Sequence, residues 1–278
     1  MSDVIYNEYQ PNNQLKRFIE KIWYCKADNL TSDTLTIPLA NHELVFNFSE
    51  NFEIRKLSDR RFTIENPVAW INGLQTKAFF SCASGKHEML GVLFKPNGLK
   101  SFLRYSSTDF TDNFIEAKLV FGREIETIIQ QIQESPLACD KIALTENFLI
   151  NRILECSYPK YLSYSLQQLS ATIGSKGSIT KICNQLSISN KSLIEAYKKH
   201  IGINPIKYSH LQAINKAVLL LSNDPNQSLT KLAYTLNFYD QSHFTSLFKS
   251  ITSLTPTEYT VHLNNKEVDV SSPNFISL

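Results

Sequence analysis

Between Ser178 and Tyr259 the chain repeats one pattern of apolar and polar positions, with an offset of fifty or fifty-one residues. Each copy starts with a serine suited to cap a helix and continues with apolar residues three or four positions apart. A short break follows, and then a second helical pattern begins. The matching apolar positions are Ile179, Ile182, Leu186, Leu193 and Tyr197 in the first copy, and Leu229, Leu232, Leu236, Phe244 and Phe248 in the second. This repeat predicts two helix-turn-helix units.

The break in each copy predicts a tight turn that needs a residue with positive φ. Asn237 suits that position, and Ser187 suits it less well, because asparagine enters the left-handed region more easily than serine does. The second helix of each unit should begin after Ser189 or Asn190 and after Asp240, whose side-chain oxygens can accept hydrogen bonds from the first amides of a helix.

A single long helix is predicted between the two units, over residues 205–221, and Gly202 is a suitable terminator for the helix before it. A continuous helix would fix the distance between the two units. Two units held in this way can place one helix each in successive major grooves of double-stranded DNA, about 34–36 Å apart. DNA binding is therefore the function that the repeat favours.

The region from about residue 164 to residue 263 resembles the DNA-binding domain of the AraC/XylS family of bacterial transcription regulators. The residues that carry the resemblance are Leu232, Ala233, Phe238, Asp240, Ser242, His243, Phe244, Phe248, Lys249, Thr255, Pro256 and Tyr259. The resemblance implies an all-α domain and a sequence-specific transcriptional regulator, with activation as the expected direction. It also implies double-stranded DNA as a partner and RNA polymerase as a candidate partner.

Correspondence with the family indicates which side chains face the DNA. Base edges are expected to meet Lys191, Ile194, Glu195, Gln241, Ser242, Thr245 and Ser246, and phosphates are expected to meet Lys198, Lys199 and Lys249. Family members usually carry arginine at the positions of Glu195 and Ser246, so this chain departs from the pattern there. An alternative reading pairs Glu195 with Lys198 or Lys199 on the helix surface.

Charge is unevenly distributed along the chain. Residues 164–263 contain nine lysines and four acidic residues, whereas the rest of the chain has nineteen basic and twenty-two acidic residues. A basic C-terminal region favours contact with phosphates. The last arginine is Arg152, and lysine lacks the bidentate fork that arginine offers to guanine. Two alternatives therefore stay open, which are a duplicated helical bundle and an adaptor that has lost DNA binding.

The N-terminal half shows short β-branched and aromatic runs, several of them with period-two alternation, which predicts a small antiparallel barrel or sandwich. The runs are residues 18–25, 35–37, 43–48, 68–73, 78–82 and 88–94, with a turn expected at Ser84 and Gly85. Helices are predicted over residues 96–105, 122–133 and 140–154. The fold class is therefore multidomain, with a mixed α+β domain followed by an all-α domain.

This half also resembles the sensor-like N-terminal domain of one AraC-family subgroup, through Trp23, residues 43–46, residues 70–73 and residues 91–98. The resemblance implies control by a small-molecule effector or assembly into a homodimer. Candidate effector contacts are Trp23, Phe46, Trp70, Phe79 and His87, although each of them also suits a core position. The isoleucines of residues 122–133 suit either a dimer seam or packing on the sheet of their own domain.

An enzyme is the second class to weigh, because a barrel with His42, His87, Glu43 and Glu88 could be a metal-dependent cupin. Neither histidine is followed by a further ligand at a short, regular spacing. No catalytic residue, metal ligand or cofactor site is therefore assigned, and we expect no enzymatic activity.

Length and composition complete the expectations. The 278 residues are divided into a sensor or dimerisation domain (1–156), a linker (157–163), a DNA-binding domain (164–263) and a tail (264–278). Five scattered cysteines suggest reduced thiols, and no apolar run is long enough to span a bilayer. The sequence thus predicts a cytoplasmic protein with no membrane partner.

Overall fold

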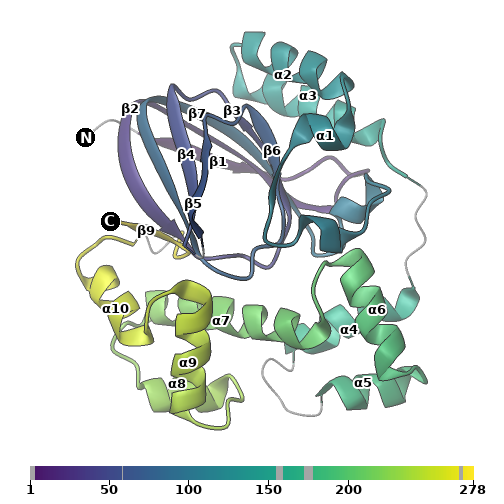
Figure 1. Cartoon of the computed structure of the whole chain (residues 1–278), viewed down its shortest axis with the longest axis vertical. Coiled ribbons are helices and arrows are strands. Elements are labelled where there is room, and N and C mark those ends of the chain that lie inside the picture. Colours follow the sequence, from purple (N-terminus) through teal and green to yellow (C-terminus); the bar gives the residue numbers. More distant parts are fainter. Residues whose placement is uncertain (1–3, 58, 155–158, 172–177, 269–271) are drawn as a thin grey trace.

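The computed structural model of the chain describes residues 4–57, 59–154, 159–171, 178–268 and 272–278. A curved antiparallel sheet with helices against it forms the N-terminal β-domain, and a set of helices forms the C-terminal helical domain (Figure 1). The predicted combination of an α+β domain and an all-α domain is confirmed. Within the described ranges, every helix is too short or too polar to span a bilayer.

All strand pairings of the nine-stranded sheet are antiparallel. The strands are β1 (Ile5–Tyr9), β2 (Ile19–Thr36), β3 (Glu43–Asn47), β4 (Asn51–Lys56), β5 (Asp59–Glu65), β6 (Ala69–Asn72), β7 (Phe79–Phe94), β8 (Phe114–Glu116) and β9 (Phe275–Ser277). The main path runs β1-β2-β7-β3-β6-β8, while β4 pairs with β5 and β7, and β9 pairs with β2.

The two long strands β2 and β7 organise this sheet. The sequence predicts each of them as two strands, with a turn at Ser84 and Gly85 in the second. In the structure β7 continues through this point, and Gly85 has a φ of +83° beside a register shift between Ala27 and Leu30 of β2. The glycine therefore accompanies a β-bulge and does not reverse the chain.

The hairpin of β4 and β5 has no counterpart in the sequence prediction. Phe52 and Ile54 point to one face of β4, and the charged residues Glu53 and Arg55 alternate with them. Because half of the positions are charged, the segment lacks the continuous apolar run on which the prediction relied.

The helices follow the predictions more closely. They are α1 (Ala117–Phe121), α2 (Glu124–Glu134), α3 (Ala138–Ile150), α4 (Lys160–Ala171), α5 (Ser178–Leu186), α6 (Asn190–His200), α7 (Pro205–Asn223), α8 (Leu229–Thr235), α9 (Gln241–Thr252) and α10 (Pro256–Asn264), with the short 3-10 helices η1 (Leu99–Ser101) and η2 (Ser107–Phe110). The predicted helix over residues 96–105 is wrong except for η1. The Gly98 amide donates to the Lys95 carbonyl oxygen at 2.7 Å and closes a turn, and Gly98 packs against the Phe18 carbonyl oxygen, only 1.9 Å from where a Cβ would lie.

Two predicted boundaries also differ from the structure. Residues 157–158 of the predicted linker lie outside the described residues, and α4 occupies the linker from Lys160 onward, directly after Pro159, whose fixed φ suits the start of a helix. The predicted tail carries β9, which adds to the edge of β2. The division into domains remains a proposal.

The isoleucine face of α2 packs inside its own domain. Ile125 and Ile132 are fully buried in the apolar cluster between the sheet and α1–α3, and Ile128 and Ile129 pack against that cluster. Of the two alternatives for this face, the structure therefore supports packing against the core of the β-domain.

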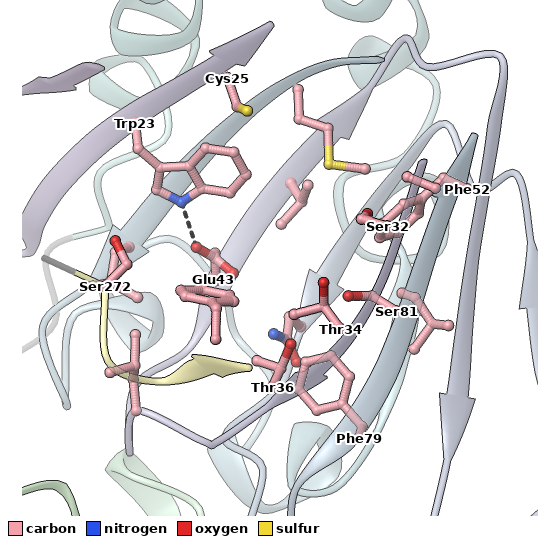
Figure 2. A pocket seen from close by; sticks show the side chains of 18 of the residues that line it. Trp23, Cys25, Ser32, Thr34, Thr36, Glu43, Phe52, Phe79, Ser81 and Ser272 are labelled. Carbon is pink, nitrogen blue, oxygen red and sulfur yellow. Dashed lines mark hydrogen bonds between the residues drawn. The ribbon is translucent and has the colours of Figure 1, made fainter. Parts of the chain in front are cut away.

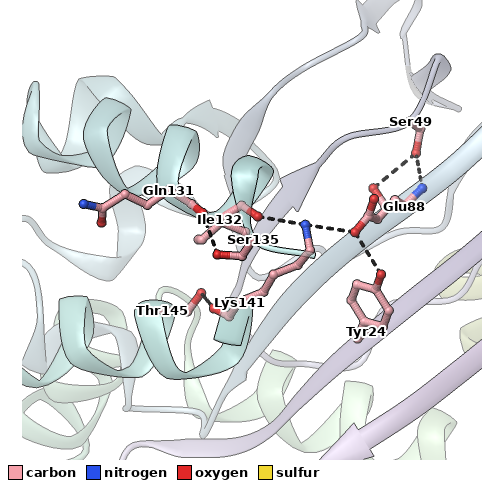
Figure 3. Close-up of polar contacts among 8 residues, drawn as sticks. All are labelled: Tyr24, Ser49, Glu88, Gln131, Ile132, Ser135, Lys141 and Thr145. Atoms are coloured by element: carbon pink, nitrogen blue, oxygen red, sulfur yellow. Dashed lines mark hydrogen bonds and ion pairs between the residues drawn. The ribbon is translucent and has the colours of Figure 1, made fainter. Parts of the chain in front are cut away.

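A buried ion pair ties α3 to the sheet (Figure 3). Lys141, whose side chain is 3% exposed, lies 3.0 Å from Glu88 Oε1 and donates to the Ile132 carbonyl oxygen at 2.7 Å. The Tyr24 hydroxyl donates to the same Glu88 oxygen at 2.8 Å, and the Glu88 amide donates to Ser49 Oγ at 3.1 Å. Each polar group of the pair therefore has further partners, as buried charges require.

The β-domain binds the carboxyl ends of α6 and α9. The Thr108 hydroxyl donates to the Lys198 carbonyl oxygen at 2.8 Å, and the Thr111 hydroxyl donates to that of Gly202 at 3.0 Å. At the other unit, the Ala78 amide donates to the Ile251 carbonyl oxygen at 2.7 Å. The last carbonyls of a helix lack the amide of a following turn, so these bonds give them partners from the β-domain and hold both helices against the sheet.

His42 makes a further bond of this kind, in a fixed tautomer. The Leu74 amide donates to Nδ1 at 3.0 Å, so this nitrogen must be unprotonated, and Nε2 donates to the Ile201 carbonyl oxygen at 3.0 Å. Burial lowers the pKa of His42 to about 4. The side chain is 0% exposed, and protonation of Nδ1 would break the bond to Leu74.

Removing the buried charge of Lys141 tests the ion pair. We expect Lys141→Met to lower the free energy of unfolding by about 3 kcal/mol, because Glu88 then loses its cation in a poorly solvated site. The matched control is Lys118→Met, since Lys118 pairs with Glu126 and both side chains are about half exposed. Its effect should stay below about 1 kcal/mol. Equal effects in urea denaturation would contradict a stabilising role of the buried pair.

The fixed tautomer of His42 predicts a pH effect. Because its pKa is lowered in the folded state, the unfolded chain takes up the proton first, and stability is lost as the pH falls from about 6.5 towards 4. In His42→Gln the amide can accept from Leu74 and donate to Ile201 without titrating. We expect near wild-type stability for this variant at pH 7.5 and about 3 kcal/mol less loss of stability between pH 7 and pH 4. Parallel pH profiles in urea denaturation would refute the assignment.

Candidate nucleic-acid interface and effector cavity

Both predicted turns adopt the left-handed conformation. Asn237 has a φ of 61° and Ser187 has a φ of 53°, so both positions behave as the sequence predicts, including the less suitable serine. Ser189 Oγ accepts from the Ser192 amide at 3.0 Å and Asp240 Oδ1 accepts from the His243 amide at 2.7 Å, so these two residues cap α6 and α9. The side chain of Ser178, the predicted cap of α5, lies outside the described part.

The apolar residues of the repeat form the core of each unit. Leu193, Tyr197, Phe244 and Phe248 are all 0% exposed. The rings of Phe244 and Phe248 pack edge to face, with centroids 5.8 Å apart. With these four side chains directed inward, the opposite faces of α6 and α9 are left to solvent.

The side chains predicted to meet base edges lie on these outer faces. Six of the seven are exposed, and Thr245 is half-buried; the exposed ones are Lys191, Ile194, Glu195, Gln241, Ser242 and Ser246. The three predicted phosphate contacts, Lys198, Lys199 and Lys249, are also exposed. The roles of these residues remain predictions.

Two contacts modify the predicted surface. Glu195 lies 4.0 Å from Lys191 and has no ion pair with Lys198 or Lys199. Because the side chains of Lys191 and Glu195 are both exposed, their ion pair contributes little to stability. Gln241 Oε1 accepts from the Thr230 hydroxyl of α8 at 2.6 Å. This bond orients the amide of Gln241 while its NH₂ group remains able to donate outward.

The β-domain has a cavity of about 410 Å³ on the concave side of the sheet, partly open to solvent (Figure 2). Its lining comes from alternate residues of β2, β3, β4, β6 and β7, because successive side chains of a strand point to opposite faces. In β2 the residues that face the cavity have odd numbers at first, as at Trp23 and Cys25, and even numbers from Leu30 onward. The bulge after Ala27 causes this change, and it keeps the second half of β2 facing the cavity.

Four of the five candidate effector contacts line this cavity: Trp23, Trp70, Phe79 and His87. Phe46 does not line it, and takes the core position that the sequence analysis gave as the alternative. The neighbouring residue of β3, Val45, faces the cavity, so Phe46 points to the other face, where it is fully buried in the cluster against α1–α3.

The two histidines of the alternative cupin reading serve different parts of the domain. His42 binds the end of α6 and does not line the cavity, whereas His87 lines it and contacts Ser49 Oγ through Nδ1 at 3.0 Å. Among the described residues no group of three metal-ligating side chains occurs. The structure therefore does not bring the suggested ligands together.

Glu43 is a cavity residue that the sequence analysis did not select as an effector contact. Its Oε1 accepts from Trp23 Nε1 at 2.6 Å. Burial raises the pKa of Glu43, while hydrogen bonds from Trp23 and Asn72 and the charge of Lys21 oppose that rise. Glu43 lies two residues before Val45 on β3, so the alternation of side chains along the strand places both on the cavity side. Its hydrogen bond with Trp23 had no sequence signal, because it joins two strands that are distant in the sequence.

The C-terminal segment forms another part of the lining, through Ser272 and Phe275. Asn274 Nδ2 donates to Asn215 Oδ1 on α7 at 2.8 Å, and Asn215 Nδ2 donates to the Pro38 carbonyl oxygen at 2.9 Å. Because Pro38 also lines the cavity, these bonds connect the cavity with the long helix between the two units.

Two family matches cover different parts of the chain. Residues 7–116 match a family described as a domain of unknown function (DUF6597), and residues 182–261 match a family described as a helix-turn-helix domain. The first lies within the β-domain, and the second begins inside α5 and includes most of both repeated units.

The curated relatives include the HTH-type transcriptional activators RhaS of Salmonella arizonae and Salmonella newport, each 34% identical over 68 residues. This match covers 24% of the chain, and the chain spans about a quarter (24%) of the length of these relatives. Among solved structures, ToxT from Vibrio cholerae matches 94% of this chain and 98% of its own, with 11% identity and a TM-score of 0.49.

The sequence relatives and the observed fold agree on the C-terminal region. The two units are capped, turned and packed as the AraC/XylS resemblance implies. Residues 182–261 therefore match a helix-turn-helix family and fold as two tandem helix-turn-helix units, in agreement with the AraC/XylS resemblance of this region.

Proposed function

We propose that the protein is a sequence-specific DNA-binding transcriptional regulator, controlled by a small molecule that binds in the β-domain. The observation that carries the proposal is the pair of outward faces on α6 and α9, which we call the reading helices. Each is an exposed polar surface on a helix whose opposite face is fully buried. Each of these helices follows the same left-handed turn and capped start, which is the repeated unit that a tandem helix-turn-helix domain requires.

The length of α7 suits two adjacent grooves. The helix has nineteen residues and at 1.5 Å per residue is about 28 Å long. The two units lie at its two ends (Figure 1). Since successive major grooves on one face of DNA are about 34–36 Å apart, α7 is a spacer of the required order.

The exposed side chains suggest what each reading helix recognises. The oriented amide of Gln241 can pair with adenine, and the methyl groups of Ile194 and Thr245 can pack against thymine. Lys191 can reach guanine and Glu195 can accept from cytosine. Because α9 offers no basic side chain among its base-facing positions, its half-site should depend little on guanine.

Non-specific attraction to DNA would come from lysines alone. Lys198, Lys199 and Lys249 are exposed at the carboxyl ends of the reading helices and would position the domain on phosphates. The adaptor alternative, in which DNA binding is lost, requires these charges to have no such role. Binding that weakens with added salt, as expected when several phosphates are neutralised, would exclude the adaptor.

Control by a bound molecule is supported by the position of the cavity. Its lining includes Pro38, Phe275 and Ser272, which belong to the segments that contact α7 and extend from α10. A molecule that favours one position of these segments would shift the reading helices with them. The Salmonella relatives are named activators, and we extend the proposal to activation with RNA polymerase as a partner. A homodimer is proposed on the family resemblance alone.

The operator provides one test. Bound duplexes selected from a random pool and sequenced should contain two half-sites about one helical turn apart. In the half-site of α9, no position should require a G·C pair, so any other base pair should be accepted where G·C occurs. An invariant guanine that becomes dispensable in a Gln241 variant would contradict the proposed reading.

Substitutions separate base reading from phosphate contact. We expect Gln241→Ala to reduce discrimination at one base pair about tenfold and leave the others unchanged. We expect Lys249→Ala to weaken all sequences alike and to lower the salt slope by about one. The controls are Gln130→Ala and Lys26→Ala, which alter exposed residues of the β-domain. Fluorescence anisotropy on an operator and its single-base variants measures both effects. No effect of either α9 substitution would refute the proposed interface.

A further inference from the structure

The cavity of the β-domain combines aromatic walls with one inward carboxyl group. Trp23, Phe52, Trp70 and Phe79 supply ring surfaces, and the Phe52 and Trp70 rings are stacked with centroids 5.7 Å apart. Glu43 lies among them, with one oxygen bonded to the Trp23 indole (Figure 2). Glu43 also accepts from Asn72. Because each carboxylate oxygen can accept more than one hydrogen bond, Glu43 has capacity left for a donor in the cavity.

The charges around the cavity favour a cationic occupant. Lys21 is the only lysine or arginine among the described lining residues, and it forms an ion pair with Glu8. His87 is bonded to Ser49, and burial lowers the pKa of His87, so its ring is neutral near pH 7. With Glu43 ionised, Lys21, Glu8 and Glu43 together carry one excess negative charge. An anionic molecule would meet no cation that lacks a partner.

We propose that the effector is a small, mainly apolar amine, whose ammonium group binds Glu43 and whose apolar body packs against the aromatic walls. This inference rests on the proposed control by a small molecule and names its chemical class. A carboxylate in an apolar site is poorly solvated, so a ligand cation that donates to it is strongly favoured. Phe52 covers one face of the Trp70 ring, and a cation over the other face would add cation–π attraction. The volume of about 410 Å³ lies within the range of small-molecule sites.

The chain carries its own reporter for this test. It has two tryptophans, Trp23 and Trp70, and both line the cavity. A molecule that enters the cavity must therefore change the tryptophan emission. Three probes of one shape separate charge from apolar packing, namely cyclohexylmethylamine, cyclohexylmethanol and cyclohexanecarboxylate, none of which absorbs where tryptophan is excited.

The experiment titrates the full chain with each probe at pH 7.5 and follows tryptophan emission and heat. We expect the amine to bind about tenfold more tightly than the alcohol, since a hydrogen bond to a charged group is worth that much, and the carboxylate to bind most weakly. In Glu43→Gln the amide can still accept from Trp23, so the amine should lose about tenfold in affinity and the alcohol should be unchanged. Glu20→Gln, which alters an exposed carboxylate of the same sheet, should behave as wild type.

Lys21→Met gives an independent result if Glu43→Gln fails to fold. Removal of Lys21 makes the cavity more negative, so the amine should bind more tightly and the carboxylate more weakly. Preference for the carboxylate in the wild type, or equal binding of all three probes, overturns the inference. DNA binding is measured separately, so a wrong ligand class with intact operator binding leaves the regulator proposal standing. If the amine binds but the protein does not bind DNA, the ligand class stands and the regulator proposal fails.

Discussion

The structure depends on the hydrogen bonds from the β-domain to the carboxyl ends of the reading helices. At α6 the carbonyl oxygens of Lys198, Ile201 and Gly202 accept from Thr108, His42 and Thr111, and at α9 the carbonyl of Ile251 accepts from Ala78. Residues of the β-domain also share one buried apolar cluster with the helical domain; they are Leu35, Ile37, Ala40, Leu74 and Ala78. Separation of the domains would expose both kinds of group, so these contacts couple the β-domain to the reading helices.

The helical domain could be predicted from sequence because its signals are local. Asp240 caps a helix three residues from the amide that it binds, and Asn237 sets its own backbone conformation. Phe244 and Phe248 are buried and lie four residues apart in the same helix. The residues expected to meet DNA were assigned from the family resemblance, and the exposure of most of them is compatible with that expected role. The bond between Thr230 and Gln241 joins two helices and had no local signal.

The β-domain could be predicted only in class, because its details depend on distant pairings. A glycine with positive φ has the same sequence signal in a turn as in a bulge, so Gly85 divided one strand into two in the prediction. Phe46 and Val45 are both apolar, and only the position of the covering helices decides which of them faces the cavity. The contact between Glu43 and Trp23, and the approach of Phe275 to the cavity, join segments that no short pattern connects.

The return of the chain to the sheet through β9 limits how the helical domain can move. The chain leaves the β-domain between α3 and α4 and comes back to it after α10 (Figure 1). A body attached at two separate points retains one easy rotation, about the line through both attachments. Reorientation without loss of β9 pairing would therefore be a rocking motion, in which α6 and α9 tilt together against the DNA axis and their separation stays constant.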